Sequence, residues 1–271
     1  MALDLYDKAD FYNYHARAIE IPITFSCNLN CKYCSHLSQY MSKVPHVPVE
    51  HIERMCTDWS ERINIRYVRL IGGEPLLHPD LEKIIEICAQ YWKLSKAYFC
   101  GLEIVTNGLL LPKMSPSFFE LLKHYDILLR VSVYPTPRWS EIQAFLSSLE
   151  SPVATFDSTT FLKYYDYVDG KPVLFQSDAA KAHALCVLFK RCHVLCDNKL
   201  YHCSVPVYWC KAQEKGIIAD NRLLTYRPAT IDMSPQQLQL WYDEGFNTDM
   251  CGMCRDTSLF VMNNENHIIE K

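Results

Sequence analysis

The chain has 271 residues, of which 49% are hydrophobic and 21% are charged. This length suits one large catalytic domain or a core with a small appendage, and the apolar content excludes a disordered chain. Lys+Arg total 27 against Asp+Glu 31, for a formal net charge of −4, so we expect no nucleic-acid partner. Neither a secretory leader nor an apolar stretch long enough to cross a membrane is evident, which predicts a cytoplasmic protein without a membrane partner.

The first two-thirds of the chain alternates strand and helix patterns. Short apolar runs bounded by polar or glycine-bearing turns predict strands over Ala18–Thr24, Ile65–Ile71, Leu102–Thr106, Ile127–Val133 and Pro172–Gln176. Apolar residues at helical spacing and Ser-Pro or proline start signals predict helices over Val49–Arg62, Pro79–Trp92, Ser115–His124 and Trp139–Leu149. This alternation favours a parallel sheet with outer helices, and about six such units are too few for a closed eight-stranded barrel. We therefore predict a partial (β/α)6 TIM barrel.

From about Ala184 the pattern changes to a cysteine-rich one. Lys199–His202 and Leu223–Tyr226 are predicted as short strands, and Ser234–Gly245 as a helix that opens with a capping box of Ser234 and Gln237. We predict a core domain at 1–183 and a small α+β subdomain at 184–271. A segment of this size gains much stability from a metal staple.

Thirteen cysteines occur in the chain. Disulfides do not persist in reducing cytosol, and an odd number argues further against a fully paired framework. Cys56, Cys88 and Cys100 each stand alone near a helix or strand pattern, as buried cysteines do. The other ten fall in the groups 27–34, 186–210 and 251–254, and such clustering indicates metal or iron–sulfur binding.

Cys27, Cys31 and Cys34 follow the first predicted strand on one loop. Thiolates suit iron–sulfur clusters or zinc, and three ligands leave one metal position open for chemistry. The alternatives are structural zinc with His36 or His46 as the fourth ligand, or three buried cysteines. Zinc sites typically use two close cysteine pairs, which this spacing fits poorly.

The stretch CNLNCKYC resembles the CxxxCxxC signature of the radical S-adenosylmethionine (SAM) superfamily, with the aromatic Tyr33 before the last cysteine. The resemblance implies a [4Fe–4S] cluster on Cys27, Cys31 and Cys34, chelated by the amino and carboxylate groups of SAM. An electron from a donor such as flavodoxin or ferredoxin would then cleave SAM. The products would be methionine and a 5′-deoxyadenosyl radical that abstracts a substrate hydrogen.

Three further motifs follow the next predicted strands: GGEP at 72–75, TNG at 106–108 and the segment VSVY at 131–134. Each is a turn signal by itself, but in this order they resemble the SAM-binding motifs of the same superfamily. The shared position at the carboxyl ends of successive strands, where barrel folds bind ligands, favours this interpretation. The residues that the resemblance assigns to SAM are Tyr33, Gly72, Gly73, Glu74, Thr106, Asn107 and Ser132.

The cysteines beyond residue 184 include a CxxC pair and could form a closed four-cysteine site, for iron–sulfur or for zinc. Their arrangement resembles the twitch subdomain, a shortened SPASM-like unit that holds one auxiliary [4Fe–4S] cluster. Asn198 stands where that family has glycine, and asparagine also tolerates positive φ. The implied ligands are Cys186, Cys203, Cys251 and Cys254, with Cys192 as a rival to Cys186.

The first cysteine comes at residue 27, which leaves no room before it for a leader-binding domain. We therefore expect a small polar substrate (a sugar, aminocyclitol or glycan precursor) and either dehydrogenation or epimerisation. Epimerisation needs a thiol that returns a hydrogen atom, for which Cys192 and Cys210 are candidates, with Cys196 as a further spare thiol. A peptide-modifying maturase and a non-enzymatic zinc or redox-sensing module are the alternatives. The sequence does not select among Arg130, Tyr134, Asp157 and Arg191 for substrate binding.

Overall fold

The protein is built on one mostly parallel sheet of eight strands, in the order β13-β12-β11-β2-β4-β5-β6-β7. The structure, a computed structural model, describes residues 3–4, 18–41, 43–93, 101–157, 160–162, 164–186, 192–243, 248–257 and 261–263. The bounds of the sheet strands are Ala18–Thr24 (β2), Tyr67–Gly72 (β4), Gly101–Thr106 (β5), Leu128–Val133 (β6), Val153–Asp157 (β7), Cys192–Cys196 (β11), Lys199–Tyr201 (β12) and Ala229–Thr230 (β13).

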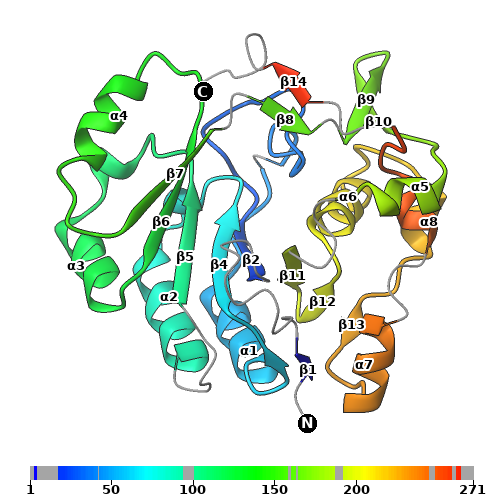
Figure 1. The fold of residues 1–271 in the computed structure, drawn as a ribbon, viewed down its shortest axis with the longest axis horizontal. Coiled ribbons are helices and arrows are strands. Elements are labelled where there is room, and N and C mark those ends of the chain that lie inside the picture. Colours follow the sequence, from blue (N-terminus) through cyan, green and yellow to red (C-terminus); the bar gives the residue numbers. More distant parts are fainter. Residues whose placement is uncertain are drawn as a thin grey trace.

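Strands β11, β2, β4, β5, β6 and β7 run parallel to one another, and β12 and β13 extend the β11 edge in antiparallel fashion. Because β7 and β13 stand at opposite ends of the strand order, the sheet is open (Figure 1). The predicted partial (β/α)6 TIM barrel is therefore confirmed. Its sixth parallel strand is β11, which lies beyond the boundary that we predicted at residue 183.

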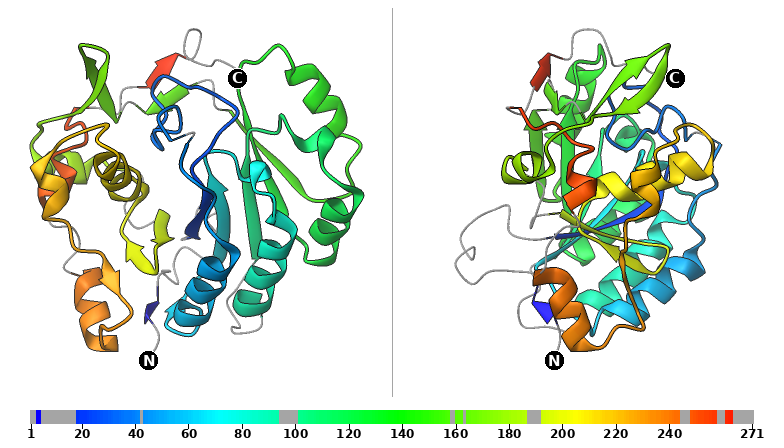
Figure 2. Two further views of the ribbon diagram at one scale, coloured as in Figure 1. Left: turned by 180° about the vertical axis from the view of Figure 1, so that it is seen from behind. Right: turned by 90° about the vertical axis from the view of Figure 1, so that its right-hand side faces the viewer.

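Helices cover the outer face of the sheet, as Figures 1 and 2 show. They are α1 (Val49–Trp59), α2 (Leu81–Cys88), α3 (Pro116–His124) and α4 (Trp139–Leu146). A π-helical turn over Ala89–Lys93 continues α2, and the side chain of Ser115 caps α3 by accepting from the Phe118 N–H. Apolar side chains of α1, α2 and α3 pack against the outward residues of β2, β4 and β5 in one buried cluster. This packing fixes the strand ends that carry the motifs.

A second buried cluster joins the cysteine loop to the C-terminal part of the chain. It contains Phe25, Tyr33, Leu37 and Met41 from the loop region, packed with Tyr208 and other residues of the later segments. These later segments include β9 (Tyr165–Val168), β10 (Lys171–Leu174), α5 (Ala179–Ala184), α6 (Ser204–Glu214), α7 (Pro235–Asp243) and α8 (Thr248–Cys251). The cysteine loop thus lies between two cores.

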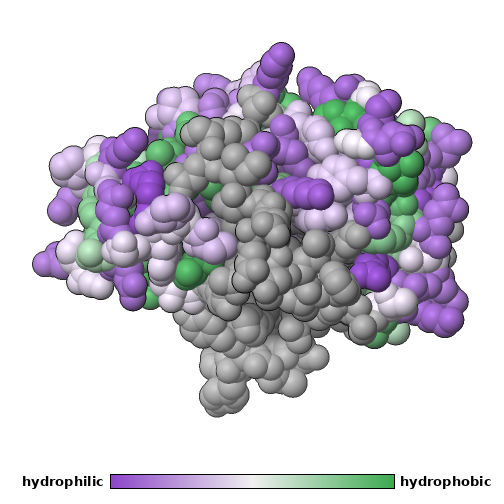
Figure 3. Space-filling model, turned by 90° about the horizontal axis from the view of Figure 1, so that it is seen from above, coloured by the Kyte–Doolittle hydropathy of each residue, from purple (hydrophilic) through white to green (hydrophobic). Residues whose placement is uncertain are grey.

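Short pairings complete the fold. Strand β1 (Leu3–Asp4) pairs with β3 (Ile63–Asn64), β9 forms a hairpin with β10, and β8 (Thr160–Leu162) pairs with β14 (Val261–Asn263). Seen from above, hydrophilic side chains cover most of the coloured surface (Figure 3). Among the described residues, no helix is long and apolar enough to cross a membrane.

Two predicted strands need correction. Leu223–Tyr226 is not a strand, because the Asp220 side chain accepts from the Arg222 N–H and begins a 3₁₀ turn over Asn221–Leu224. The strand predicted at Pro172–Gln176 exists as β10, but it pairs with β9 in a hairpin outside the barrel. The capping box at α7 is confirmed, since the Gln237 N–H donates to Ser234 and the Ser234 N–H donates to Gln237.

Candidate functional site

One cavity of about 160 Å³ lies at the carboxyl ends of β2, β4, β5 and β6. The three cysteines of the CxxxCxxC loop line it. The other predicted SAM-site residues that line it are Gly72, Gly73, Thr106, Asn107 and Ser132. The structure thus brings together motifs that lie more than 100 residues apart in the sequence. The carboxyl edge of a parallel barrel is where such folds bind ligands.

Gly72 and Gly73 permit a close backbone contact between the loop after β4 and the loop that carries the cysteines. A Cβ on Gly73 would meet the Ser26 carbonyl oxygen at 2.2 Å, and a Cβ on Gly72 would meet that of Thr24 at 2.5 Å. The Gly73 N–H donates to Thr24 at 3.0 Å, and the Glu74 N–H donates to Ser26 at 2.8 Å. The glycines are therefore needed for this backbone contact, and both also line the cavity.

Glu74 does not line the cavity, but it is hydrogen-bonded to Thr106 and Asn107, which do. Its buried carboxylate accepts from the Leu76 N–H at 3.0 Å, from the Thr106 hydroxyl at 2.7 Å and from the Asn107 N–H at 2.8 Å. Burial raises the pKa of Glu74 to about 7, although these hydrogen bonds act in the opposite direction. The structure thus shows Glu74 joining the loops after β4 and β5, and its predicted SAM contact stays a prediction.

Asn107 connects the loop after β5 to the cysteine loop. Its side-chain amide donates to Asn28 at 2.7 Å, and its carbonyl oxygen accepts from the Leu109 N–H at 3.0 Å. Next to Asn28, the Leu29 N–H points at the Cys27 sulfur at 3.4 Å. Hydrogen bonds to cysteine sulfur tune iron–sulfur centres. The loop therefore has a backbone arrangement suited to a cluster ligand.

Tyr33 lies behind the cysteine loop, away from the cavity lining. Its ring contacts those of Tyr165 and Tyr167, with centroids 5.8 and 5.5 Å away. Both tyrosine hydroxyls donate to the Lys32 carbonyl oxygen. These aromatic contacts pack the loop against β9, and the SAM contact predicted for Tyr33 stays a prediction.

The donor set of the cavity fits a cluster better than a single metal ion. Among the described residues, no group of three or more His, Cys, Asp or Glu side chains is arranged to hold one ion. A zinc ion requires every sulfur at about 2.3 Å from one centre. A four-iron cluster binds each thiolate to a different iron, so the sulfurs can lie farther apart. Three thiolates around this cavity fit that second requirement.

Both histidines weighed as a fourth zinc ligand have other partners. His36 Nδ1 lies 2.8 Å from the Gly72 carbonyl oxygen, and its ring stacks on Tyr208 with centroids 4.0 Å apart. Burial lowers the pKa of His36 to about 4. His46 Nδ1 lies 2.9 Å from the Thr24 hydroxyl. His36 nevertheless lines the cavity, a position that the sequence analysis did not assign to it.

A second cavity, of about 30 Å³, brings together the four predicted auxiliary ligands, Cys186, Cys203, Cys251 and Cys254. Cys203 is the N-cap residue before α6, Cys251 ends α8 and Cys186 follows α5. Burial raises the pKa of the Cys203 thiol, and that of Cys254 to about 12, with neighbouring cysteines adding to both shifts. Without a cation these two thiols stay protonated, and metal binding would release their protons.

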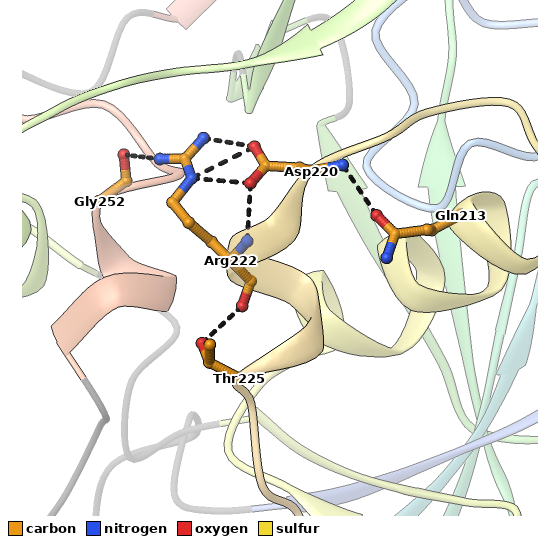
Figure 4. Close-up of polar contacts among 5 residues, drawn as sticks. All are labelled: Gln213, Asp220, Arg222, Thr225 and Gly252. Carbon is orange, nitrogen blue, oxygen red and sulfur yellow. Dashed lines mark hydrogen bonds and ion pairs between the residues drawn. The ribbon is translucent and has the colours of Figure 1, made fainter.

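Arg222 holds the Cys251–Cys254 turn in place (Figure 4). Its guanidinium donates to both Asp220 carboxylate oxygens, at 2.9 and 2.6 Å, and to the Gly252 carbonyl oxygen at 3.2 Å. The Asp220 N–H in turn donates to Gln213 of α6 at 2.8 Å. This bidentate pair has a fixed geometry, so it orients the turn relative to α6.

Two of the thiols proposed as hydrogen-atom donors, Cys196 and Cys210, do not line the first cavity. Cys210 lies on α6 with its sulfur 3.9 Å from the Leu223 carbonyl oxygen, and burial raises its pKa to about 11. Cys196 is buried at the end of β11, and burial raises its pKa to about 12. Cys192 begins β11, but its side chain lies outside the described residues. No structural observation therefore favours any of the three as a hydrogen-atom donor.

Asn198 adopts the positive φ expected at the family's glycine position, with φ of 58°. Its amide donates to Asp58 at 2.6 Å, and its side-chain oxygen accepts from the Trp59 indole at 3.0 Å. The left-handed turn is thereby anchored to α1. This is the conformation that asparagine tolerates better than most residues.

Charged side chains form a layer across the inner face of the sheet. Glu20 of β2 aligns with Arg69 of β4, which aligns with Glu103 of β5. The Glu103 carboxylate binds Arg69 at 2.5 Å and Arg130 of β6 at 3.4 Å. Glu20 also lines the cavity. Sequence reasoning missed Glu20, although one charged residue inside the apolar run AIEIPIT signals an inward-facing polar position.

Of the four substrate-binding positions left open, Tyr134 lines the cavity. Burial, and then the charges of the three loop cysteines, raise the pKa of its phenol. The Arg130 guanidinium lies 3.4 Å from the Glu103 carboxylate and forms an ion pair with it. The Asp157 side chain and Arg191 lie outside the described residues.

Residues 21–135 match the Radical SAM superfamily. An open parallel barrel with a three-cysteine loop and a ligand cavity at its carboxyl edge is consistent with that class, which the match over residues 21–135 supports. Members of this superfamily use SAM together with a [4Fe–4S] cluster that SAM chelates.

Among curated relatives, the probable GTP 3',8-cyclase of Methanothermobacter marburgensis is 33% identical over 98 residues, 36% of this chain and 30% of that protein. The GTP 3',8-cyclase of Rhodopirellula baltica is 32% identical over 96 residues, 35% of this chain and 25% of that protein. The chain thus spans less than a third of the length of these two relatives.

Two solved structures align with this chain at low similarity. Native anSMEcpe with bound AdoMet aligns with a TM-score of 0.43 and 19% identity, over 53% of this chain and 44% of that one. SuiB of Streptococcus suis aligns with a TM-score of 0.41 and 10% identity, over 84% of this chain and 65% of that one.

Proposed function

We propose that this protein is a radical SAM enzyme that cleaves SAM at a [4Fe–4S] cluster held by Cys27, Cys31 and Cys34. One observation carries the proposal: the three cysteines line a single cavity with the glycine loop, the TNG segment and Ser132. When bound, the cluster and SAM supply the 5′-deoxyadenosyl radical that abstracts a substrate hydrogen. The loops that line the cavity are positioned by Thr106, Asn107 and the two glycines.

The substrate is proposed to be a small polar molecule, such as a sugar, aminocyclitol or glycan precursor, and the outcome dehydrogenation or epimerisation. GTP is the competing substrate, because the curated relatives are named GTP 3',8-cyclases. Their similarity to this chain covers only 98 and 96 residues, so it does not extend to most of either relative. A peptide-modifying maturase is a further alternative within the same superfamily.

We also propose an auxiliary [4Fe–4S] cluster on Cys186, Cys203, Cys251 and Cys254, within a twitch-like subdomain at 184–271. The shared cavity of these four cysteines supports it. The first cluster would receive its electron from a donor such as flavodoxin or ferredoxin. We place the enzyme in the cytoplasm, where thiols stay reduced.

The test is the metal content per chain of protein prepared and reconstituted without oxygen. Roughly eight irons per chain would support both clusters, and about four would support the SAM cluster alone. Zinc with little iron would contradict the proposal and favour a structural zinc or redox-sensing module.

A further inference from the structure

The β9–β10 hairpin lies outside the eight-stranded sheet and contacts both cysteine-bearing parts of the chain. Asp169 and Gly170 form its two-residue turn, with φ of 49° and 74°, the conformation that connects two antiparallel strands directly. A two-stranded hairpin by itself is marginally stable at best in water. Its order in this protein therefore depends on what its two strands contact.

Strand β9 holds a peptide group inside the CxxxCxxC loop. The Tyr165 hydroxyl donates to the Lys32 carbonyl oxygen at 2.7 Å, and the Tyr167 hydroxyl donates to the same oxygen. The Gln39 amide donates to that oxygen at 3.1 Å and to the two hydroxyls at 3.0 and 3.2 Å. Tyr165 is fully buried, so water competes little for its hydrogen bond. The loop is thus fastened to β9 at a defined point.

The chain that leaves β10 is bonded to the Cys251–Cys254 turn. The Phe175 N–H donates to the Met253 carbonyl oxygen at 3.2 Å, and the Ser177 N–H donates to the Gly252 carbonyl oxygen at 2.9 Å. Both carbonyl groups belong to the two residues between the cysteines of the turn. The hairpin is therefore fastened at its other strand to the backbone of the proposed auxiliary site.

The same hairpin also packs on α6, whose N-cap residue is the auxiliary ligand Cys203. The ring of Tyr165 contacts that of Trp209 of α6, with centroids 5.2 Å apart. A metal centre bonded to all four C-terminal cysteines would fix α6 and the Cys251–Cys254 turn relative to one another. It would thereby fix two of the elements against which the hairpin rests.

The two anchors of the hairpin are close together across its strands. The register places Tyr165 opposite Leu174, and Phe175 follows directly. We propose that the hairpin couples the two cysteine sites, so that filling the C-terminal site orders the CxxxCxxC loop, with Tyr165 and Tyr167 as positioning residues. This proposal rests on the function proposed above and gives the auxiliary site a role in positioning the loop of the SAM cluster. Such coupling is reciprocal, so an ordered loop also favours binding at the C-terminal site.

The experiment measures amide hydrogen exchange in a protein whose loop cannot bind a cluster. In the triple variant Cys27→Ala, Cys31→Ala, Cys34→Ala, reconstitution with iron and sulfide without oxygen should fill the C-terminal site alone. We expect exchange in the peptide over residues 28–41 to slow by about fivefold or more on reconstitution, the lower end of typical coupling between sites. Unchanged exchange in protein that has bound iron would overturn the proposal. Failure of the triple variant to bind iron would overturn it too, because no second site would then exist.

The tyrosine hydroxyls are tested in the same background. Adding Tyr165→Phe and Tyr167→Phe keeps both rings but removes the bonds to the Lys32 carbonyl oxygen, so reconstitution should no longer slow exchange in the loop. Tyr91→Phe, in the turn after α2, is the matched control and should leave the slowing intact. Slowing that persists without the two hydroxyls would overturn their assignment. Tyr167 is half-buried, so Tyr167→Phe alone replaces the pair if the double substitution prevents folding.

A spectroscopic readout separates positioning from a merely structural role. With the three loop cysteines present, Tyr165→Phe, Tyr167→Phe should weaken the change that SAM produces in the electron paramagnetic resonance spectrum of the reduced protein. A change equal to that in Tyr91→Phe would overturn the positioning role. If wild-type protein forms no 5′-deoxyadenosine, the proposed function fails, whereas the exchange measurement in the triple variant still decides whether the two sites are coupled.

Discussion

The Thr106 hydroxyl donates to the Glu74 carboxylate at 2.7 Å and thereby connects the loop after β4 to the end of β5. The same carboxylate accepts from two backbone N–H groups, and the Thr106 hydroxyl accepts from the Gly108 N–H at 3.0 Å. Two motifs that are turns when taken singly therefore form one hydrogen-bonded unit beneath the cavity. The glutamate and the threonine position the loops that line the site.

Glu74→Gln should destabilise the protein. An amide in place of the carboxylate directs an NH₂ group at a buried N–H or hydroxyl donor, which leaves donors without acceptors and costs about 1–3 kcal/mol. Urea unfolding of the two proteins measures this difference. Glu82→Gln is the control, because the partners of Glu82 are serine hydroxyls that can rotate to suit an amide. An equal effect of both substitutions would contradict the bracing role.

Glu74 also predicts a pH dependence of stability. Burial raises its pKa from 4.5 to about 7 in the folded protein, so the folded state binds more protons than the unfolded state between those values. The contribution of this group to the free energy of unfolding is therefore fully present below the lower value and is lost as pH rises through the upper one. Glu74→Gln should flatten this part of the profile. Parallel profiles for the two proteins would exclude Glu74 as its source.

Gly73→Ala should displace the cysteine loop. A Cβ at this position would lie 2.2 Å from the Ser26 carbonyl oxygen, which is too close for backbone to accommodate without moving. We expect less iron per chain after reconstitution and slower SAM cleavage. Gly170→Ala is the control: nothing lies within 4 Å of its Cβ, so only its positive φ of 74° adds strain. Full iron content in Gly73→Ala would show that the close contact is not needed.

Arg222→Ala should loosen the Cys251–Cys254 turn. Without the guanidinium, the Asp220 carboxylate and the Gly252 carbonyl oxygen lose the group that joins them. Iron should fall from roughly eight towards four per chain, while the cluster at the SAM site remains. Arg227→Ala is the control, because that guanidinium bonds only to nearby carbonyl oxygens of its own loop among the contacts described. Iron content equal to that of Arg227→Ala would mean that Arg222 does not position the turn.

Cys210→Ala should retain both iron content and 5′-deoxyadenosine formation. Cys210 packs on α6 near the Leu223 carbonyl oxygen and lines neither cysteine cavity. The removed sulfur should cost stability alone, by about 1 kcal/mol. Loss of product formation with intact SAM cleavage would instead restore Cys210 as a hydrogen-atom donor.

The sequence predicted the parts of the fold that depend on local patterns. The run Ala18–Thr24 forms a strand with the expected bounds, because it is apolar and ends in a polar turn. Ser115 and Ser234 likewise mark helix starts through their side-chain caps. The sequence did not predict which distant strands pair. Strand β11 (Cys192–Cys196) pairs in parallel with β2, although its cysteine-rich pattern indicated a separate appendage.

In the candidate site too, local patterns predicted some features, and contacts between distant segments determined the others. The sequence order of the motifs was sufficient to expect that Cys27, Gly72, Asn107 and Ser132 share one edge of the sheet, and all four line the cavity. The contact of His36 with Tyr208 depends on α6 folding back over the cysteine loop. No local pattern contains that contact, and the same is true of the Arg222 contact with Gly252.

The most direct test compares reduced, reconstituted wild-type protein with the triple variant Cys27→Ala, Cys31→Ala, Cys34→Ala in the presence of SAM. The wild type should form 5′-deoxyadenosine and methionine in equal amounts. The triple variant should form neither, while it keeps the iron bound by the four C-terminal cysteines. Formation of 5′-deoxyadenosine by the triple variant would contradict the assignment of these cysteines to the cluster that cleaves SAM.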